Sequence, residues 1–551
     1  MKRRTFLKNT AATGLSVGFG AMGLLTGSCS KSYAFDLLLK GGLVLDGSGR
    51  QGVRTDVAIR NKKIAVVGSV NDTSAHRVID LNGLVLAPGF IDVHSHSESK
   101  LLVNPKAESK IRQGVTTEIL GQDGDSFHPE QFSAEFQKYE DAGIAVNIAS
   151  TVGQGTIRKA VMDMTDRAAT PTEIAAMKSL AAAALRDGAL GISSGLEYTP
   201  GGFASTQEII ELCQVMQGSC GLYATHMRNE DDRLVEAVAE AIEIARGANI
   251  GLHISHLKCQ GRRNWDKLDR VLALMQEFRQ NGGSVTMDRY PYVAYSTGLS
   301  NLMPLWSRAG GTDKFIERLQ DSETLTKIKQ ATMKKIDLLG SWDSVMITSV
   351  TLEKNKQMQG KTVARIVAQS QQDAFEFVRS LIIEEKNQVG MVGFGMSEDN
   401  TKRILAQPFC MPASDGSALA TYGALSQGNP HPRSYGTFPR VLGKYVREEK
   451  IATLPEMIRK MTSLPATRFG LTGRGSIAEG FMADLVAFDP EKVRDKATYS
   501  HPHQYPEGIE WVVVNGDVVV EHSEHSGKLP GRVLRGLVEK HFSADDTDER
   551  R

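Results

Sequence analysis

The stretch Ala87-Pro88-Gly89-Phe90-Ile91-Asp92-Val93-His94-Ser95-His96 organises the rest of the chain. It predicts a short strand, apolar at Phe90, Ile91 and Val93, that ends in two histidines one residue apart. Side chains two positions apart on a strand point to the same face, so we expect the two imidazoles to lie side by side. Two neutral imidazoles placed in this way can bind one metal ion. The alternative for an isolated His-x-His is a pair of surface histidines.

From about residue 90 to residue 471, short apolar strands alternate with helical runs. Examples of the strands are Ala189 to Ser194, Leu222 to His226, Gly251 to His256 and Ser284 to Asp288. This alternation is typical of βα units and predicts an α/β fold built on a (β/α)8 TIM-like barrel. Such barrels carry their chemistry at the C-terminal ends of the strands. Residues His94, His96, His226, His256 and Asp415 all stand at predicted strand ends.

The two ends of the chain show a different pattern, of short alternating strands separated by turns. It occupies residues 35–89 and returns in residues 472–551, so we expect one small β-sandwich assembled from both termini. Residues from about 301 to 408 fit the βα pattern poorly. We interpret them as an insertion between late barrel strands, and as a candidate lid over the active-site mouth.

Composition excludes several classes of protein. The chain has 551 residues, 41% of them hydrophobic, which predicts an ordinary globular protein with one large and one smaller domain. A formal charge of +1 offers no basic surface to neutralise phosphates, so no nucleic-acid partner is expected. None of the five cysteines forms a Cys-x-x-Cys pair, which argues against a zinc ribbon or a disulfide framework.

Residues 1–34 are predicted to be an export signal. Lys2-Arg3-Arg4-Thr5-Phe6-Leu7-Lys8 matches the twin-arginine motif, and a small, apolar run from Ala11 to Leu25 follows it. Leu25-Thr26-Gly27-Ser28-Cys29 resembles a lipobox, so Cys29 is a candidate for lipidation and a lipid anchor in the membrane. The alternative is simple cleavage near Ala34. The expected location is the periplasm, either free or as a membrane-anchored lipoprotein.

Further metal-binding side chains follow later strands. Asp123 stands in a glycine turn after the strand that begins near Gly114, and His226, His256 and Asp415 follow other strands. Together with the first two histidines they supply four imidazoles and two carboxylates. This set suffices for one or two metal ions with an open position for water. Each histidine taken singly is more often a core or surface residue, but their common place at strand ends favours a metal site.

Several motifs resemble those of the N-acyl-D-amino-acid deacylases (D-aminoacylases), a branch of the amidohydrolase superfamily. They are Gly89 to His96, Gly114 to Thr117, Gly195 to Pro200, Ile254 to Lys258, Asp288 to Tyr292, Ser414 to Gly416, His431 to Arg440 and Gly473 to Gly475. The resemblance implies hydrolysis of the amide bond of a small-molecule N-acyl-D-amino acid, releasing a carboxylate and a free D-amino acid. It also implies that His226 and His256 bind metal tightly, while His94, His96 and Asp415 surround a weaker or vacant second position.

The chain departs from the family at one turn. Family members often carry a metal-binding cysteine in a Gly-x-Cys-Gly turn, whereas this turn reads Gly121-Gln122-Asp123-Gly124. We expect Asp123 to be a metal ligand, with capping of the turn as the alternative. A carboxylate is a harder ligand than a thiolate, so Mn²⁺, Co²⁺ and Ni²⁺ join Zn²⁺ as candidates for the one or two ions.

Roles in the reaction follow from these positions. A metal lowers the pKa of bound water, and Asp415 would accept the water proton and deliver it to the departing nitrogen. Lys258 and Arg433 are candidates to bind the substrate carboxylate. By resemblance, Tyr198, Tyr290 and Ser296 would form hydrogen bonds with the substrate, and Arg228 and Tyr292 are further candidates.

Other functions compete with this prediction. A dihydropyrimidinase- or hydantoinase-like enzyme would open cyclic amides, but its relatives commonly carry a carbamylated lysine, for which no counterpart stands at these strand ends. A D-dipeptidase is a second alternative. The third is a catalytically silent exported binding protein, which would not need to keep Asp415. No oligomeric state is predicted.

Overall fold

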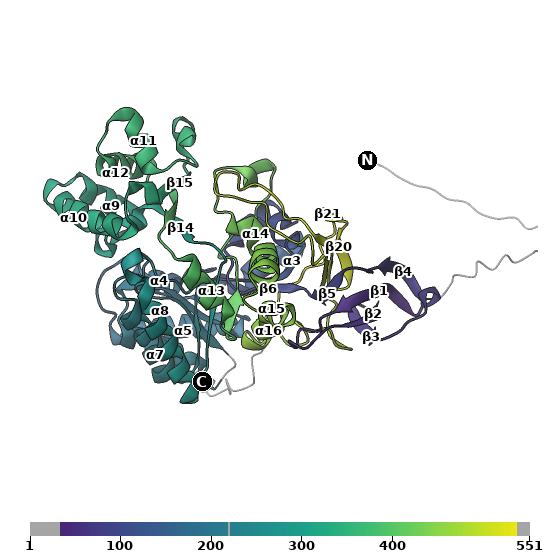
Figure 1. Ribbon diagram of the computed structural model, residues 1–551. Helices are drawn as coiled ribbons and strands as arrows, with labels where there is room; N and C mark the ends of the chain where they lie inside the picture. The colour runs from purple at the N-terminus through teal and green to yellow at the C-terminus, as the bar shows by residue number, and fades with distance from the viewer. Residues whose placement is uncertain (1–32, 219–220, 537–551) are drawn as a thin grey trace, which may run out of the picture.

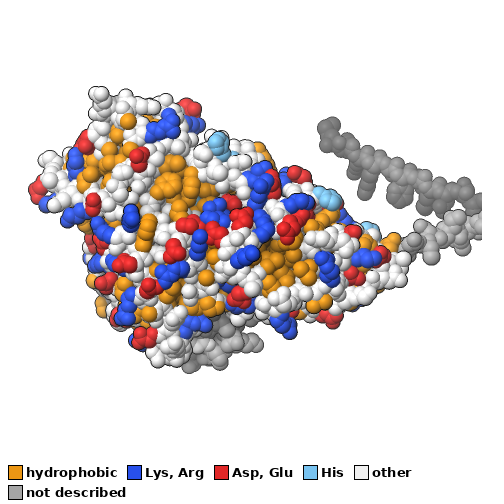
Figure 2. Space-filling view, viewed as in Figure 1, with side chains coloured by type: hydrophobic (Ala, Val, Ile, Leu, Met, Phe, Trp, Pro, Cys, Tyr) orange, Lys and Arg blue, Asp and Glu red, His pale blue; other side chains and the backbone are white. Residues whose placement is uncertain are grey.

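The computed structural model describes residues 33–218 and 221–536. Almost all of the predicted export signal, including Cys29, lies outside the described residues, as does Cys220. Across the described part of the chain, no helix combines the length and the apolar character needed to cross a membrane. Figure 2 shows basic and acidic side chains mixed on the visible face, in keeping with the formal charge of +1.

A parallel barrel forms the centre of the molecule. Its strands are β6 (Phe90–Asp92), β7 (Val115–Leu120), β8 (Asn147–Ser150), β9 (Val152–Gly153), β10 (Gly191–Gly195), β11 (Leu222–His226), β12 (Gly251–Ile254), β13 (Val285–Arg289) and β17 (Cys410–Pro412). A three-stranded sheet, β6-β7-β8, and a six-stranded sheet, β9-β10-β11-β12-β13-β17, make it up. Strands β8 and β9 are consecutive parts of one strand of the barrel, so the nine labelled strands correspond to eight barrel strands. Hydrogen bonds from Leu190 N to Ser150 O and from Asp415 N to His94 O close it.

Helices cover the outside of the barrel, as expected for parallel strands that are buried on both faces. They are α1 (Glu98–Val103), α2 (Glu108–Ile111), α3 (Phe132–Ala142), α4 (Gln154–Met162), α5 (Pro171–Arg186), α6 (Thr206–Cys213), α7 (Leu234–Ala248), α8 (Leu268–Gln280), α13 (Glu398–Ala406), α14 (Arg433–Arg440), α15 (Leu454–Met461) and α16 (Ser463–Arg468). In α7, Leu234, Val238, Ala241, Ala245 and Ala248 form one buried stripe at helical spacing. The predicted α/β barrel is confirmed.

A nine-stranded sheet joins the two ends of the chain (Figure 1, right). Its strands are β1 (Phe35–Val44), β2 (Val53–Arg60), β3 (Lys63–Val67), β4 (Ala75–Asp80), β5 (Val85–Pro88), β18 (Leu485–Phe488), β19 (Ile509–Val514), β20 (Asp517–Glu521) and β21 (Glu524–His525). Strand β18 pairs with β5, and a bridge between Lys63 and Met482 brings the β3 edge back to the C-terminal segment. The sheet therefore curls around its own apolar core. Strand β1 is continuous from Phe35 to Val44, and its register against β2 shifts between Leu39 and Gly42.

The inserted domain has its own sheet and its own core (Figure 1, upper left). It contains β14 (Ala294–Gly298), β15 (Val345–Ser349), β16 (Gly390–Phe394), α9 (Gly311–Gln320), α10 (Ser322–Leu339), α11 (Val363–Ser370) and α12 (Ala374–Glu384). This domain begins earlier than residue 301, because β14 pairs antiparallel with β16. It also ends before residue 408, since Ile404 and Leu405 of α13 pack in the core of the barrel.

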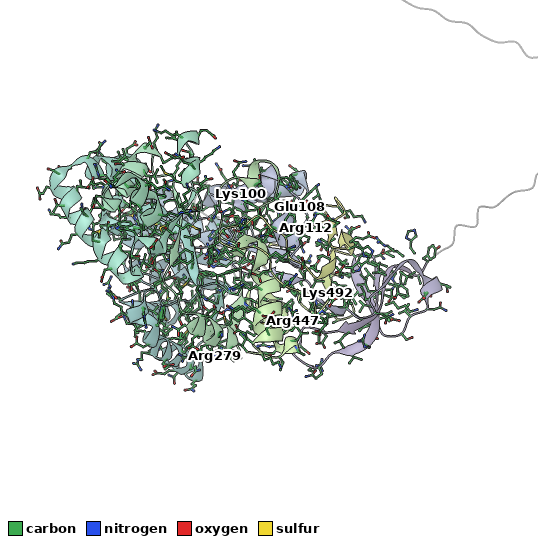
Figure 3. The ribbon with its side chains drawn as sticks, turned by 45° about the horizontal axis from the view of Figure 1, so that its top comes forward. Lys100, Glu108, Arg112, Arg279, Arg447 and Lys492 are labelled. Atoms are coloured by element: carbon green, nitrogen blue, oxygen red, sulfur yellow. The ribbon has the colours of Figure 1, made fainter. Side chains whose placement is uncertain are left out.

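Polar contacts fix the barrel against the terminal sheet. Glu108 and Arg112, both labelled in Figure 3, come from the region of α2. Arg112 Nε lies 2.6 Å from Glu108 Oε2, and Arg112 Nη2 lies 2.9 Å from Glu524 Oε2 of β21. The region of α2 is thus tied to β21, the last strand of the described residues.

Candidate metal-binding active site

His94 and His96 extend from the end of β6 into the mouth of the barrel. The His94 ring is fully buried, and its Nδ1 lies 3.3 Å from Asp288 Oδ2. Its Nε2 lies 3.4 Å from Asp123 Oδ1 and 3.7 Å from Asp415 Oδ1. His96 Nε2 lies 3.1 Å from the same Asp415 oxygen and 3.5 Å from Asp123 Oδ2. His94, His96, Asp123 and Asp415 can therefore offer ligand atoms to one metal ion.

A second group of ligands lies beside the first and shares Asp123. His226 Nδ1 lies 3.0 Å from His256 Nε2, and His256 Nε2 lies 3.2 Å from Asp123 Oδ1. The distance from His226 Nδ1 to Asp123 Oδ2 is 3.8 Å. The Asp123 carboxylate thus lies between two pairs of imidazoles. From this position a carboxylate can bridge two metal ions.

Unpaired polar atoms show that these residues suit a cation. His94 Nε2 and Asp123 Oδ1 are buried and have no hydrogen-bond partner among the described residues. Buried polar atoms nearly always have such a partner, and a metal ion between these ligands would supply one. Imidazole and carboxylate together are the ligands that zinc and neighbouring divalent metals take in proteins.

The pKa shifts of the site residues also indicate that the site favours positive charge. Burial lowers the pKa of His96, but Asp123 and Asp415 outweigh this effect and raise the pKa to about 9. Burial raises the pKa of Asp415, whereas the Arg433 guanidinium and His94 bring it far below its ordinary value. The carboxylates are therefore ionised and draw cations into the mouth of the barrel.

Three supporting carboxylates, Glu197, Glu230 and Asp288, lie behind the imidazoles. Glu197 Oε2 lies 3.6 Å from His226 Nε2, and Glu230 Oε1 lies 3.1 Å from His256 Nδ1. Carboxylates in this position orient the ring of a ligand histidine and raise its basicity. Sequence reasoning did not assign them a role, although each stands at or just after a barrel strand.

Three of the ligand residues have an unusual backbone. Asp123, His256 and Asp415 have φ values of 56°, 35° and 49°, in the left-handed region that residues other than glycine seldom adopt. Such conformations persist where the surrounding structure holds them, and they cluster at functional sites. Here they turn the chain sharply at the strand ends and aim the side chains at the barrel axis.

A cavity of about 1140 Å³ opens onto these ligands. It is lined by His96, Asp123, Tyr198, His226, His256, Lys258, Tyr290, Ser296, Asp415 and Arg433. His94 lies behind this surface, and the inserted domain contributes one wall through Tyr295, Ser296, Thr297 and Asn301. Ten of the thirteen residues singled out from the sequence as metal-binding, catalytic or substrate-binding candidates therefore border one cavity.

The two cations predicted to bind substrate already have partners. Lys258 Nζ lies 2.5 Å from Glu230 Oε1 and 2.7 Å from His256 Nδ1. Arg433 Nη1 lies 2.6 Å from Asp415 Oδ2. The Lys258 ammonium and the Arg433 guanidinium lie 5.9 Å and 4.9 Å from the centre of the Tyr290 ring. Together they form a cationic wall beside the metal ligands.

Arg228 and Tyr292 lie elsewhere. Arg228 is bound to Glu240 and to the carbonyl oxygens of Gly202 and Ala204, so its donors are used in holding loops together. Tyr292 Oη lies 3.5 Å from Asp495 Oδ2. Neither side chain is among the residues that line the cavity, so this geometry does not support their expected role in substrate binding.

Comparison with known proteins identifies related sequences and structures. The model of the amidohydrolase family matches residues 77–245 and 424–520. The chain is 36% identical to a D-aminoacylase of Alcaligenes xylosoxydans xylosoxydans over 92% of its own length and 99% of that protein. It is 34% identical to the N-acyl-D-glutamate deacylase of the same organism, over 91% of its length and 96% of that protein.

Solved structures agree with the sequence comparison. The N-acyl-D-glutamate deacylase of Bordetella bronchiseptica, complexed with zinc and a phosphonate inhibitor, superimposes with a TM-score of 0.78 at 33% identity, covering 91% of this chain and 100% of that chain. A crystal structure of D-aminoacylase gives a TM-score of 0.76 at 36% identity, with the same coverage. An L-hydantoinase from Arthrobacter aurescens, at 16% identity and a TM-score of 0.55, shares the fold.

Proposed function

The chain belongs to the amidohydrolase family, in the branch of the D-aminoacylases, and we propose that it hydrolyses the amide bond of N-acyl-D-amino acids. The products are a carboxylate and a free D-amino acid. One observation carries the proposal: four imidazoles and two carboxylates meet beside the cationic wall in a chain 36% identical to a D-aminoacylase.

We propose that Asp123, His226 and His256 hold one divalent metal, and that His94, His96 and Asp415 with Asp123 form a second position. A metal bound there supplies a water of lowered pKa and polarises the amide carbonyl. Zinc is the first candidate, because the related N-acyl-D-glutamate deacylase was crystallised with zinc. The Asp123 carboxylate replaces the thiolate expected in this turn, and as a harder ligand it also suits manganese, cobalt or nickel.

Asp415 acts as the general base in this proposal. Its carboxylate is ionised, borders the cavity and lies 3.1 Å from His96 Nε2. It accepts the proton of the attacking water and delivers it to the departing nitrogen, since an amine leaves only after protonation. The backbone of Asp415, hydrogen-bonded to His94 O, fixes the carboxylate at the seam where the barrel closes.

The cationic wall binds the carboxylate of the amino acid. Arg433 has a planar fork of donors that matches a carboxylate, and its Nη2 lies 3.4 Å from Ser296 O. Lys258 adds a point charge, and Tyr290 and Ser296 line the same side of the cavity. Tyr198, whose Oη lies 3.3 Å from Thr297 Oγ1, borders the cavity near His226 and would contact the acyl part.

The experiment that tests this function measures hydrolysis of matched N-acyl-D- and N-acyl-L-amino acids, with zinc, manganese or cobalt added back. The panel spans acidic, apolar and basic side chains. We expect turnover of the D series, and its loss in Asp415→Ala. Turnover of hydantoins or of D-dipeptides without N-acyl-D-amino acids would replace the proposal by one of those activities, and ligand binding without any turnover would indicate a binding protein.

We also propose that the protein is exported by the twin-arginine route, on the strength of Lys2 to Lys8 in the sequence. Cys29 is the proposed site of a lipid anchor. Mass spectrometry of the mature protein would distinguish a lipidated Cys29 from cleavage near Ala34.

A further inference from the structure

A chain of hydrogen bonds and ion-pair contacts connects the inserted domain with one of the metal ligands. It starts at Lys335, on α10 of the inserted domain, whose Nζ lies 2.7 Å from Asp231 Oδ2 and 3.2 Å from Gln260 Oε1. Gln260 Nε2 in turn donates to Glu230 Oε2 at 2.8 Å. The other oxygen of that carboxylate, Oε1, lies 3.1 Å from His256 Nδ1. Lys258 Nζ, which is 2.5 Å from Glu230 Oε1 and 2.7 Å from His256 Nδ1, completes this group.

The inner members of this chain are buried, which shields their contacts from water, whereas Lys335 is partly exposed. Glu230, His256 and Gln260 are between 1% and 3% exposed, and the side chain of Lys335 is 18% exposed. Burial lowers the pKa of Lys335, but Glu197 and Asp231 outweigh this effect and raise it, so the ammonium keeps its charge. A charged donor thus reaches from the inserted domain to Asp231 and to Gln260, which contacts the supporting carboxylate Glu230.

The Gln260 side chain can relay the position of Lys335 to Glu230, because its amide oxygen accepts hydrogen bonds and its amide nitrogen donates them. An ammonium can only donate hydrogen bonds and an ionised carboxylate can only accept them. With Oε1 facing Lys335, the amide must present its NH₂ group to Glu230. Without Lys335 the amide oxygen loses its donor, and the Gln260 side chain is then held in place by Glu230 alone.

We propose that Lys335 is a positioning residue of the active site, through which the inserted domain orients Gln260 and Glu230 and so fixes the ring of His256. The His256 Nε2 atom then faces Asp123 and His226, the other two members of its ligand group. The proposal rests on the proposed function only in taking His256 as a metal ligand. The barrel alone is incomplete in this view, because the orientation of one of its ligands depends on a helix inserted between β13 and β17.

The experiment compares Lys335→Met with Lys334→Met in the full-length protein. Lys334 is the neighbouring, exposed lysine on the same helix and serves as the matched control. Zinc affinity is measured by competition with a chelator, without substrate. We expect a 10- to 100-fold weaker affinity in Lys335→Met, the range for partners of ligand side chains, and no change in Lys334→Met. Lys335→Arg should restore part of the affinity, since a guanidinium can also donate to Asp231 and Gln260.

A second variant separates positioning from a general loss of structure. Gln260→Met removes the donor to Glu230 from inside the barrel, and should weaken zinc binding to a similar extent. Because both residues act along one path, the double variant should bind zinc no more weakly than Gln260→Met alone. Additive losses, or zinc affinity like that of the wild type in folded Lys335→Met, would overturn the proposal, as would a wild type that binds no zinc. Weaker binding in a protein that hydrolyses no N-acyl-D-amino acid would overturn only the proposed function.

Discussion

Two buried polar clusters lie at opposite ends of the barrel, and they differ in how completely their atoms are paired. The mouth cluster consists of His94, His96, Asp123, His226, His256 and Asp415 at the C-terminal ends of the strands. The base cluster consists of Asn147, Arg474, Asp484 and Asn515, and Asn147 opens β8 at its N-terminal end. In the mouth cluster, His94 Nε2, Asp123 Oδ1 and His226 Nε2 are buried without a hydrogen-bond partner among the described residues.

The base cluster is saturated. Asn147 Oδ1 accepts a hydrogen bond from Asn515 Nδ2 at 2.7 Å, and Asn147 Nδ2 donates to Asp484 Oδ2 at 3.2 Å. Asn515 N donates to Asp484 Oδ1 at 2.7 Å, and Arg474 Nη2 donates to Asn515 Oδ1 at 2.9 Å. Arg474 also forms an ion pair with Asp484.

The difference separates function from stability within one fold. Fully paired buried polar groups specify how the barrel and the terminal sheet fit together. Unpaired buried polar groups are energetically costly until a bound ligand supplies the missing partner. The same division holds in (β/α)8 barrels generally, where strand C-termini carry chemistry and strand N-termini carry stability. Changes in the mouth cluster should therefore affect turnover and metal binding, and changes in the base cluster should affect unfolding.

The largest expected effect comes from removing the proposed base in the mouth cluster. Asp415→Asn should lower kcat by about 10²- to 10⁴-fold, the range for one general acid–base group, because the amide cannot accept the water proton. Metal at Asp123, His226 and His256 should remain. Steady-state kinetics and metal analysis measure both. Asp125→Asn, an exposed carboxylate on the same cavity, is the control. Retained turnover in Asp415→Asn would remove its role as base.

A change in the base cluster should produce the opposite pattern. Asp484→Asn leaves the Arg474 guanidinium buried without its carboxylate, which typically costs about 3–5 kcal/mol of unfolding free energy. The shift of the urea midpoint measures this loss, and kcat of the folded fraction should not change. Asp517→Asn breaks an ion pair with Lys528 that is half exposed, and should cost less than about 1 kcal/mol. Equal losses in the two variants would show that the base cluster is no special source of stability.

The smallest of the three expected effects is a loss of metal affinity on substitution of a supporting carboxylate, Asp288. Asp288 contacts His94 Nδ1, His253 Nε2 at 2.9 Å and the backbone nitrogen of His256 at 2.9 Å. Asp288→Asn keeps the shape but loses the charge, and should weaken metal affinity about 10- to 100-fold. Chelator competition measures the affinity, with the exposed Asp266→Asn as control. Unchanged affinity would mean that Asp288 belongs with the structural residues.

Much of the mouth cluster can be predicted from sequence, because its members follow strands with strong apolar patterns. The alternation of strands and helices also gives the barrel, since each βα unit is a local feature of the chain. The terminal sheet is predictable for the same reason, as its strands alternate within short segments at both ends.

What sequence cannot supply is the pairing between distant segments. Glu197, Glu230 and Asp288 are ordinary acidic residues until the fold brings them to the imidazoles. The sequence does not show that Lys258 and Arg433 have ion-pair partners. In the structure each forms an ion pair with a carboxylate of the site. The inserted domain starts earlier than the sequence indicates, because β14 is recognisable only through its pairing with β16, about a hundred residues further on.

The terminal sheet has a consequence for how the protein is made on the ribosome. Strands β1 to β5 emerge first, but β5 pairs on one side with β18, which is synthesised only after the entire barrel. Until then one edge of the nascent sheet stays open, and open edges recruit other strands. We therefore expect a chain that stops before β18 to be a target for chaperones and proteases.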